Sequence, residues 1–171
     1  MLLLSAPTAQ DEPDLAAFEF RNRAFFESHI NARPAAFYAH GGVARAIATA
    51  GLEAAQDTAY QFLARNEAGE LVARVNLSRV RRQHFHSAEL GYRVAEAHCG
   101  RGYATEAVRL ALEQAFCGLR LHRVEAAVRR GNTGSVKVLT RNGFVQYGHS
   151  SRSFCLAGTW HDVLHFERHG A

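Results

Sequence analysis

One segment of the sequence joins a strand-like run, a loop with two glycines and a helix that begins directly after the loop. Residues 85–94 are typical of a strand, residues 102–116 carry apolar side chains at helical spacing, and Gly100 and Gly102 lie between or at their boundary. The first N–H groups of a helix lack intrahelical partners, and the helix dipole adds partial positive charge there. Because glycines let an anion approach the backbone closely, we predict that residues 100–105 hold a phosphate or pyrophosphate.

A capped turn that binds no ligand would contain the same two glycines, so this alternative stays open. The dinucleotide-binding fingerprint needs a third glycine at the position where Thr105 stands. A P-loop is also excluded, because no Gly-Lys-Ser/Thr sequence follows the glycines.

Hydrophobic periodicity along the chain predicts an α/β protein. We predict strands at residues 2–5, 58–65, 71–77, 85–94, 124–128, 144–147, 153–156 and 160–167, and helices at residues 11–29, 41–55, 102–116 and 132–142. This order is typical of a mixed sheet with helices on its faces. The length of 171 residues fits one domain that spans residues 1–171.

Composition excludes several classes of protein. Hydrophobic residues make up 47% and charged residues 21%, which is unlike an intrinsically disordered chain. The net charge of +4 is too diffuse to require nucleic acid as a partner. Three cysteines without a Cys-x-x-Cys pair predict neither a disulfide framework nor a zinc site. The short apolar start is not a signal peptide, and no run is long enough to span a membrane, so we expect a cytoplasmic protein.

A second segment predicts another helix start. Asn132 is a good N-cap, and Ser135 and Leu139 lie on the same helical face as Asn132. By spacing alone, Asn132 could serve only as a cap and Ser135 only as a small residue against the sheet.

Five short motifs occur in one order along the chain. They are Gly91-Tyr92, the Gly-x-Gly-Tyr-Ala-Thr-Glu-Ala run from Gly100, the His-Arg-Val-Glu-Ala run from His122, Asn-x-x-Ser from Asn132, and Gly143-Phe144. Together with a Gly-x-Trp-x-Asp tail they resemble the GNAT acetyltransferases, and within them the ribosomal-protein N-terminal (RimJ/RimL-like) branch. The resemblance runs from about residue 58 to residue 168. It implies a GNAT fold with a central mixed, mostly antiparallel sheet flanked by helices.

The resemblance also implies a function. Members of the family transfer an acetyl group from acetyl-CoA to a primary amine, directly and without a metal. The implied acceptor is a protein N-terminal α-amine of the ribosomal type. This chain itself is expected to be a monomer or a homodimer. An acetyltransferase of a small-molecule amine and a non-catalytic acyl-CoA-binding module are the alternatives. The implied contacts are the pantetheine with the backbone of Tyr92, Arg93 and Val94 and with Asn132, and the pyrophosphate with Gly100, Arg101, Gly102, Tyr103, Ala104 and Thr105.

The implied catalytic residues are Glu89 and Ser135. Many members of the superfamily carry a tyrosine as general acid where this chain has Leu139, so Ser135 is the candidate that donates to the thiolate. Glu89 shares a strand face with Arg93 and is the candidate base for the amine. A surface carboxylate paired with an arginine is the alternative role for Glu89. Cys99 stands where the family often has glutamine or arginine, and backbone N–H groups should compensate for that departure.

Other residues have lesser expected roles. We expect Phe25, Phe26, Phe37 and Tyr38 to line the acceptor side. His84 and His86 would share one face of a strand but lack a third ligand, so no metal site is predicted. The basic turn of Arg79, Arg81 and Arg82 is expected to be a solvated hairpin, with the ribose phosphate of CoA or RNA as the alternatives.

Overall fold

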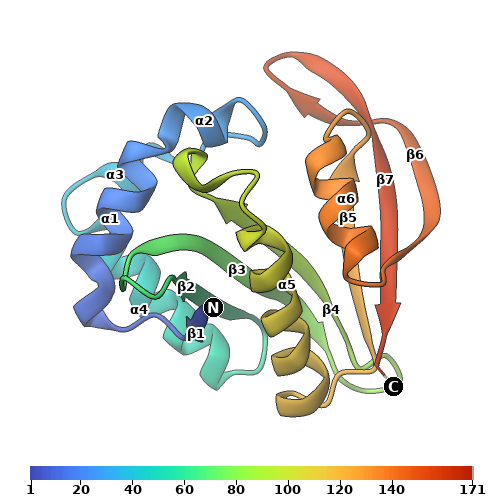
Figure 1. Ribbon diagram of the computed structural model, residues 1–171, viewed down its shortest axis with the longest axis horizontal. Coiled ribbons are helices and arrows are strands. Elements are labelled where there is room, and N and C mark those ends of the chain that lie inside the picture. Colours follow the sequence, from blue (N-terminus) through green and yellow to red (C-terminus); the bar gives the residue numbers. More distant parts are fainter. Residues whose placement is uncertain (171) are drawn as a thin grey trace.

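The computed structural model describes residues 1–170 and contains one seven-stranded sheet with helices on both faces (Figure 1). The strands are β1 (Leu3–Ser5), β2 (Tyr60–Arg65), β3 (Leu71–Arg81), β4 (Ser87–Val94), β5 (Arg123–Arg129), β6 (Val145–Leu156) and β7 (Thr159–His169). The helices are α1 (Glu12–Arg21), α2 (Arg23–Glu27), α3 (Ala35–Tyr38), α4 (Gly42–Ala55), α5 (Tyr103–Glu113) and α6 (Thr133–Arg141). The predicted α/β class and the predicted order of long elements are confirmed.

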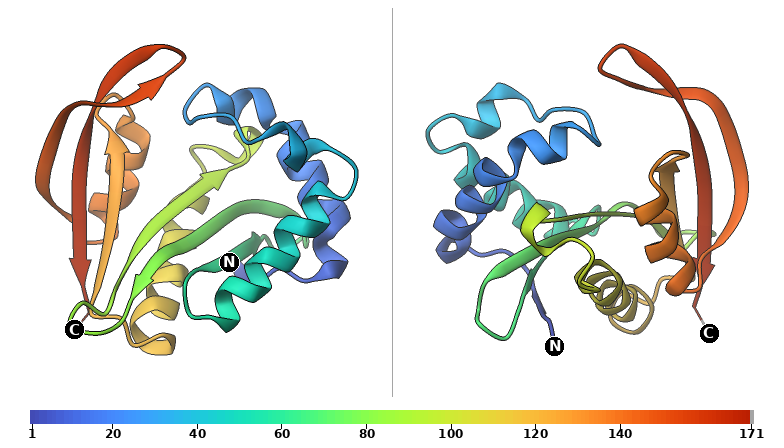
Figure 2. Two further views of the ribbon diagram at one scale, coloured as in Figure 1. Left: turned by 180° about the vertical axis from the view of Figure 1, so that it is seen from behind. Right: turned by 45° about the horizontal axis from the view of Figure 1, so that its top comes forward.

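The sheet has the order β1-β2-β3-β4-β5-β7-β6, and every pair except β4–β5 is antiparallel. The parallel pair β4–β5 is short, because it joins only Ser87, Ala88 and Glu89 to Arg123, Val124 and Glu125. Beyond these residues the two strands separate, as Figure 2 shows from behind. The sheet is therefore open between its two halves from residue 90 of β4 onward.

Two apolar clusters hold the helices against the sheet. On one face, Val108 and Leu112 of α5 and Leu139 of α6 are buried with apolar residues of the sheet. On the other, Leu15 of α1 and Ile47 of α4 are buried in a second cluster. The spacing of these side chains along each helix explains why the sequence predicted the helices.

The predicted helix over residues 11–29 is wrong in one respect, because the chain breaks at Asn22 between α1 and α2. The Asn22 amide Nδ2 donates to the carbonyl of Phe18 at 2.8 Å, and its Oδ1 accepts from the N–H of Glu96 at 2.9 Å. Asn22 thus ends α1 and ties it to the segment after β4, a contact that periodicity could not reveal.

Two other expectations are corrected. The predicted strands 144–147 and 153–156 are parts of one strand, β6, whose register against β7 shifts between Gln146 and Gly148 and again between Ser150 and Phe154. His84 and His86 do not lie on a strand but in the β3–β4 turn, where both have positive φ. The short helix α3 was not predicted from the sequence.

Candidate active site between strands β4 and β5

The separation of β4 and β5 opens onto a cavity of about 560 Å³. Its walls come from α2 and the residues after it, the end of β4, the glycine loop with the start of α5, the end of β5, and α6. The cavity brings together most of the residues that the sequence analysis selected. Tyr92, Arg93, Val94, Gly100, Gly102, Ala104, Thr105, Asn132 and Ser135 all line it.

The glycine loop has the conformation that a phosphate site needs. Gly100 and Gly102 have φ of 76° and 84°, in the left-handed region that disfavours any other residue. A side-chain carbon built on either glycine would meet no atom within 4 Å, so the space above the loop is open. Gly102 is the N-cap of α5, so the first N–H groups of that helix lack intrahelical partners, and Ala104 and Thr105 of its first turn line the cavity. These residues fit an anionic group such as a pyrophosphate.

The end of β4 offers an unpaired backbone edge. Tyr92, Arg93 and Val94 pair with β3 on one side, but the pairing with β5 stops at Glu89. A β-strand edge with free N–H and C=O groups pairs readily with an extended amide chain. The pantetheine arm of CoA contains such amides, so the edge fits it.

Asn132 and Ser135 are held together at the start of α6. The Asn132 Oδ1 accepts from the N–H of Ser135 at 3.1 Å, as the N-cap assignment predicts. The Tyr92 hydroxyl donates to the carbonyl of Ser135 at 3.4 Å, and burial raises the pKa of that phenol. Leu139 is fully buried in the core, so its side chain serves packing and supplies no acid.

Glu89 does not line the cavity. Its side chain is 44% exposed, and Arg79 donates from Nη1 to Glu89 Oε1 at 3.1 Å. This is the arginine pairing that the alternative role describes. The assignment of Glu89 as base stays a prediction.

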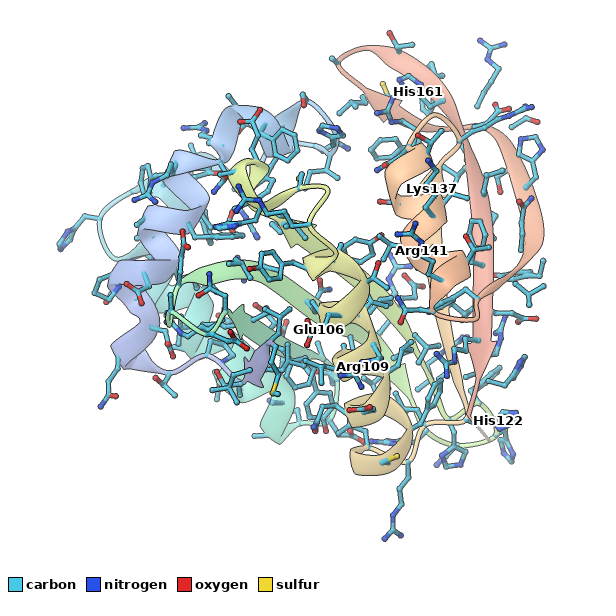
Figure 3. The ribbon with its side chains drawn as sticks, viewed as in Figure 1. Glu106, Arg109, His122, Lys137, Arg141 and His161 are labelled. Carbon is cyan, nitrogen blue, oxygen red and sulfur yellow. The ribbon has the colours of Figure 1, made fainter. Side chains whose placement is uncertain are left out.

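Two cations in the cavity wall were not predicted from the sequence. Lys137 and Arg141 lie one turn apart on α6, as Figure 3 shows. Both line the cavity. One signal could have found Lys137, because it is the only lysine in a chain that otherwise uses arginine. Lys137 and Arg141 follow Ser135 by two and six residues, so the Asn-x-x-Ser motif itself does not include them.

The aromatic residues of the acceptor side divide into two groups. Phe25 and Phe26 of α2 line the cavity as expected, together with His29 and Ile30, which the sequence analysis did not select. Phe37 and Tyr38 of α3 do not line it, and instead pack against each other with their ring centroids 5.1 Å apart.

A buried carboxylate lies behind this wall. Glu19 of α1 is fully buried and is ion-paired with Arg33, Arg74 and Arg93. Burial alone would raise the pKa of Glu19, but the three guanidinium groups outweigh it and hold this pKa below its usual range. Burial lowers the pKa of Arg93 to about 10; Glu19 opposes the shift, and Arg33 and Arg74 add to it. No periodicity in the sequence indicates this cluster, because its members come from four separate segments.

The remaining candidates have structural contacts. Burial raises the pKa of the Cys99 thiol, which disfavours the thiolate that a nucleophile would need. Arg82 donates to the Asp57 carboxylate and to the carbonyl of Leu119, and Arg81 pairs with Glu125. The basic turn is thus anchored to its own chain.

Among residues 1–170, no group of three metal-ligating side chains is found, and no helix is long and apolar enough to cross a membrane.

Known proteins match this chain in sequence and in structure. Residues 1–145 match the sequence profile of the acetyltransferase (GNAT) domain. The chain is 33% identical to the probable N-acetyltransferase YjcK of Bacillus subtilis (strain 168), over 89% of this chain and 84% of that protein.

Two solved structures share the fold over nearly the whole chain. The ribosomal-protein-S5-alanine acetyltransferase from Vibrio fischeri superposes with a TM-score of 0.92 at 24% identity, covering 98% of this chain and 92% of that one. Spermidine N-acetyltransferase from Vibrio cholerae, solved with CoA and spermine, superposes with a TM-score of 0.82 at 22% identity. The superposition covers 98% of this chain and 95% of that one.

Proposed function

This chain belongs to the GNAT acetyltransferase family and uses acetyl-CoA as acetyl donor, and we propose that its acceptor is a protein N-terminal α-amine. The observation that carries the proposal is the cavity, which joins a glycine cradle and a free strand edge to an aromatic wall on α2. The similarity to the S5-alanine acetyltransferase supports an acceptor of the ribosomal-protein type.

In this proposal, the acetyl donor binds along the free edge of β4. The N–H groups of residues 100–105 hold its pyrophosphate, and Lys137 and Arg141 add positive charge for its phosphates. The backbone of Tyr92, Arg93 and Val94 and the Asn132 amide bind the pantetheine. The thioester then lies where β4 and β5 separate, beside Ser135.

The transfer step needs a neutral amine and a stabilised leaving group. Glu89, directly or through a water, takes the proton from the ammonium group. The amine nitrogen then forms a bond to the thioester carbonyl carbon, and the C–S bond breaks. The Ser135 hydroxyl donates a hydrogen bond to the departing thiolate. The thiolate takes up the second proton, which the nitrogen loses as it becomes the amide, and leaves as the CoA thiol.

A polyamine acceptor is the second candidate, because the chain shares its fold with a spermidine N-acetyltransferase. The test is a thiol-release assay with acetyl-CoA against N-terminal peptides of ribosomal proteins, spermidine and simple amines, combined with calorimetric titration of acetyl-CoA. We expect acetyl-CoA to bind and the peptides to be acetylated. Turnover of spermidine alone would replace the proposed acceptor. Binding without turnover on any amine would favour the non-catalytic module.

A further inference from the structure

Arg93 brings a positive charge to the acceptor side of the cavity. Its neighbour on β4, Tyr92, points toward α6, where its hydroxyl reaches the carbonyl of Ser135. Side chains alternate along a strand, and Arg93 accordingly points to the other face, where Nη1 donates to Glu19 Oε2 at 3.1 Å. Its guanidinium lies 5.0 Å from the centroid of the Phe26 ring. This charge therefore lies away from the helix start that holds the pyrophosphate.

The charge of Arg93 is only partly compensated. Arg33 and Arg74 are ion-paired with the same carboxylate, so three guanidinium groups share Glu19 and leave an excess of two positive charges. Within residues 1–170, no other carboxylate forms an ion pair with these three arginines. The lowered pKa of Arg93 agrees with this, since burial and the two neighbouring arginines disfavour its charged form.

The cavity wall does not supply the missing negative charge. Besides Lys137 and Arg141, which are assigned above to the donor phosphates, the cavity is lined by Arg93 and Arg129. Of the residues that the structure describes, no aspartate or glutamate lines it. A polycationic acceptor would meet like charge there without a carboxylate to bind it. An acceptor that carries its own carboxylate would pair with Arg93 and relieve the repulsion among the three arginines.

We propose that the preferred acceptor is acidic: a peptide in which a carboxylate close to the N-terminal amine pairs with Arg93. This rests on the proposed function, because it assumes that the acceptor is a peptide N-terminus. It makes Arg93 a residue that determines specificity through its side chain, in addition to the backbone contact with pantetheine.

The test compares amidated tetrapeptides that begin with alanine and differ only in the second residue, which is glutamate, glutamine or arginine. We expect kcat/KM to fall in that order, by about tenfold or more between glutamate and arginine, because the interaction of two nearby charges reverses sign. The Arg93→Gln variant should reduce the ratio of kcat/KM between the glutamate and arginine peptides by about fivefold or more. The Arg93→Lys variant should keep most of that ratio, because it keeps the charge.

The ratio is measured on one sample with two peptides, so a partly folded variant does not obscure it. Arg109→Gln is the matched control, since Arg109 is a half-exposed arginine of α5 that is paired with Glu113 and should leave the ratio unchanged. Equal kcat/KM for the three peptides, or a ratio that Arg93→Gln leaves intact, would overturn this inference and leave the proposed function standing. Acetylation of spermidine and of none of the peptides would overturn both.

Discussion

At the scale of single residues, Glu89 has two competing roles that activity can separate. We expect Glu89→Gln to lower kcat about tenfold or more while acetyl-CoA still binds, because the amide cannot accept a proton from the amine. Arg79→Gln is the matched variant, as it frees the Glu89 carboxylate from its ion pair without removing it. Steady-state kinetics and calorimetric titration on both variants are the measurements. A Glu89→Gln enzyme with unchanged kcat would assign Glu89 to the surface ion pair alone.

The second residue-scale prediction concerns Gly102. An alanine there must adopt a φ of 84°, and its Cβ would enter the open space above the loop. Forcing a non-glycine residue into the left-handed region costs about 1–2 kcal/mol, and we expect Gly102→Ala also to weaken acetyl-CoA binding.

Gly69→Ala provides the control for this change. Gly69 has a φ of 79° and equally open surroundings, but it lies in the β2–β3 turn and does not line this cavity. Both variants should lose similar stability in urea unfolding. Only Gly102→Ala should raise the Kd for acetyl-CoA, and an unchanged Kd would argue against the phosphate cradle.

At the scale of elements, Asn132 is predicted both to start α6 and to bind the donor. Asn132→Ala removes the cap and should cost about 1 kcal/mol of stability. Asn132→Ser keeps a side-chain oxygen that can accept from the N–H of Ser135, so stability should change little. Both variants lack the amide and should raise KM for acetyl-CoA. If Asn132→Ser kept the KM of the parent protein, Asn132 would serve only as a cap.

The elements also show which parts of the fold could be predicted. Helices α4, α5 and α6 were predicted to within a few residues, because their apolar spacing and their glycine or asparagine boundaries are local signals. The break at Asn22 and the continuity of β6 were not, because each depends on partners distant in sequence. The cavity residues that carry motifs were found. Lys137, Arg141 and the ion pairs of Glu19 with its three arginines were missed, because no motif indicates them.

At the scale of the whole molecule, Glu19 joins α1, β3, β4 and the loop before α3 through its three arginines. Removing one partner of a buried ion pair costs about 3–5 kcal/mol, and we expect Glu19→Gln to destabilise the fold by a similar amount at neutral pH. Because the folded state lowers the pKa of Glu19, its contribution is present above the usual range of a glutamate pKa and is lost as pH falls through the folded pKa.

The stability difference between the parent protein and Glu19→Gln should therefore shrink in acid. Urea unfolding at neutral pH and at about pH 3 measures it directly. Glu27→Gln, which breaks an ion pair between neighbouring turns of α2, should change stability by less than about 0.5 kcal/mol at either pH. If the stability difference between the two proteins did not depend on pH, the shape of the Glu19 side chain rather than its charge would account for its contribution to stability.

The short β4–β5 pairing has a consequence for how firmly the two halves of the sheet are connected. Three residues on each strand join the two halves of the sheet, and within residues 1–170 the rest of that β4 edge pairs with no other strand. In the proposed binding mode, the donor pairs with that edge and so joins the two halves of the sheet. The co-substrate is then part of the scaffold, and amide hydrogen exchange at the end of β4 should slow once it is bound. Each round of catalysis would begin by completing the sheet and end by opening it again.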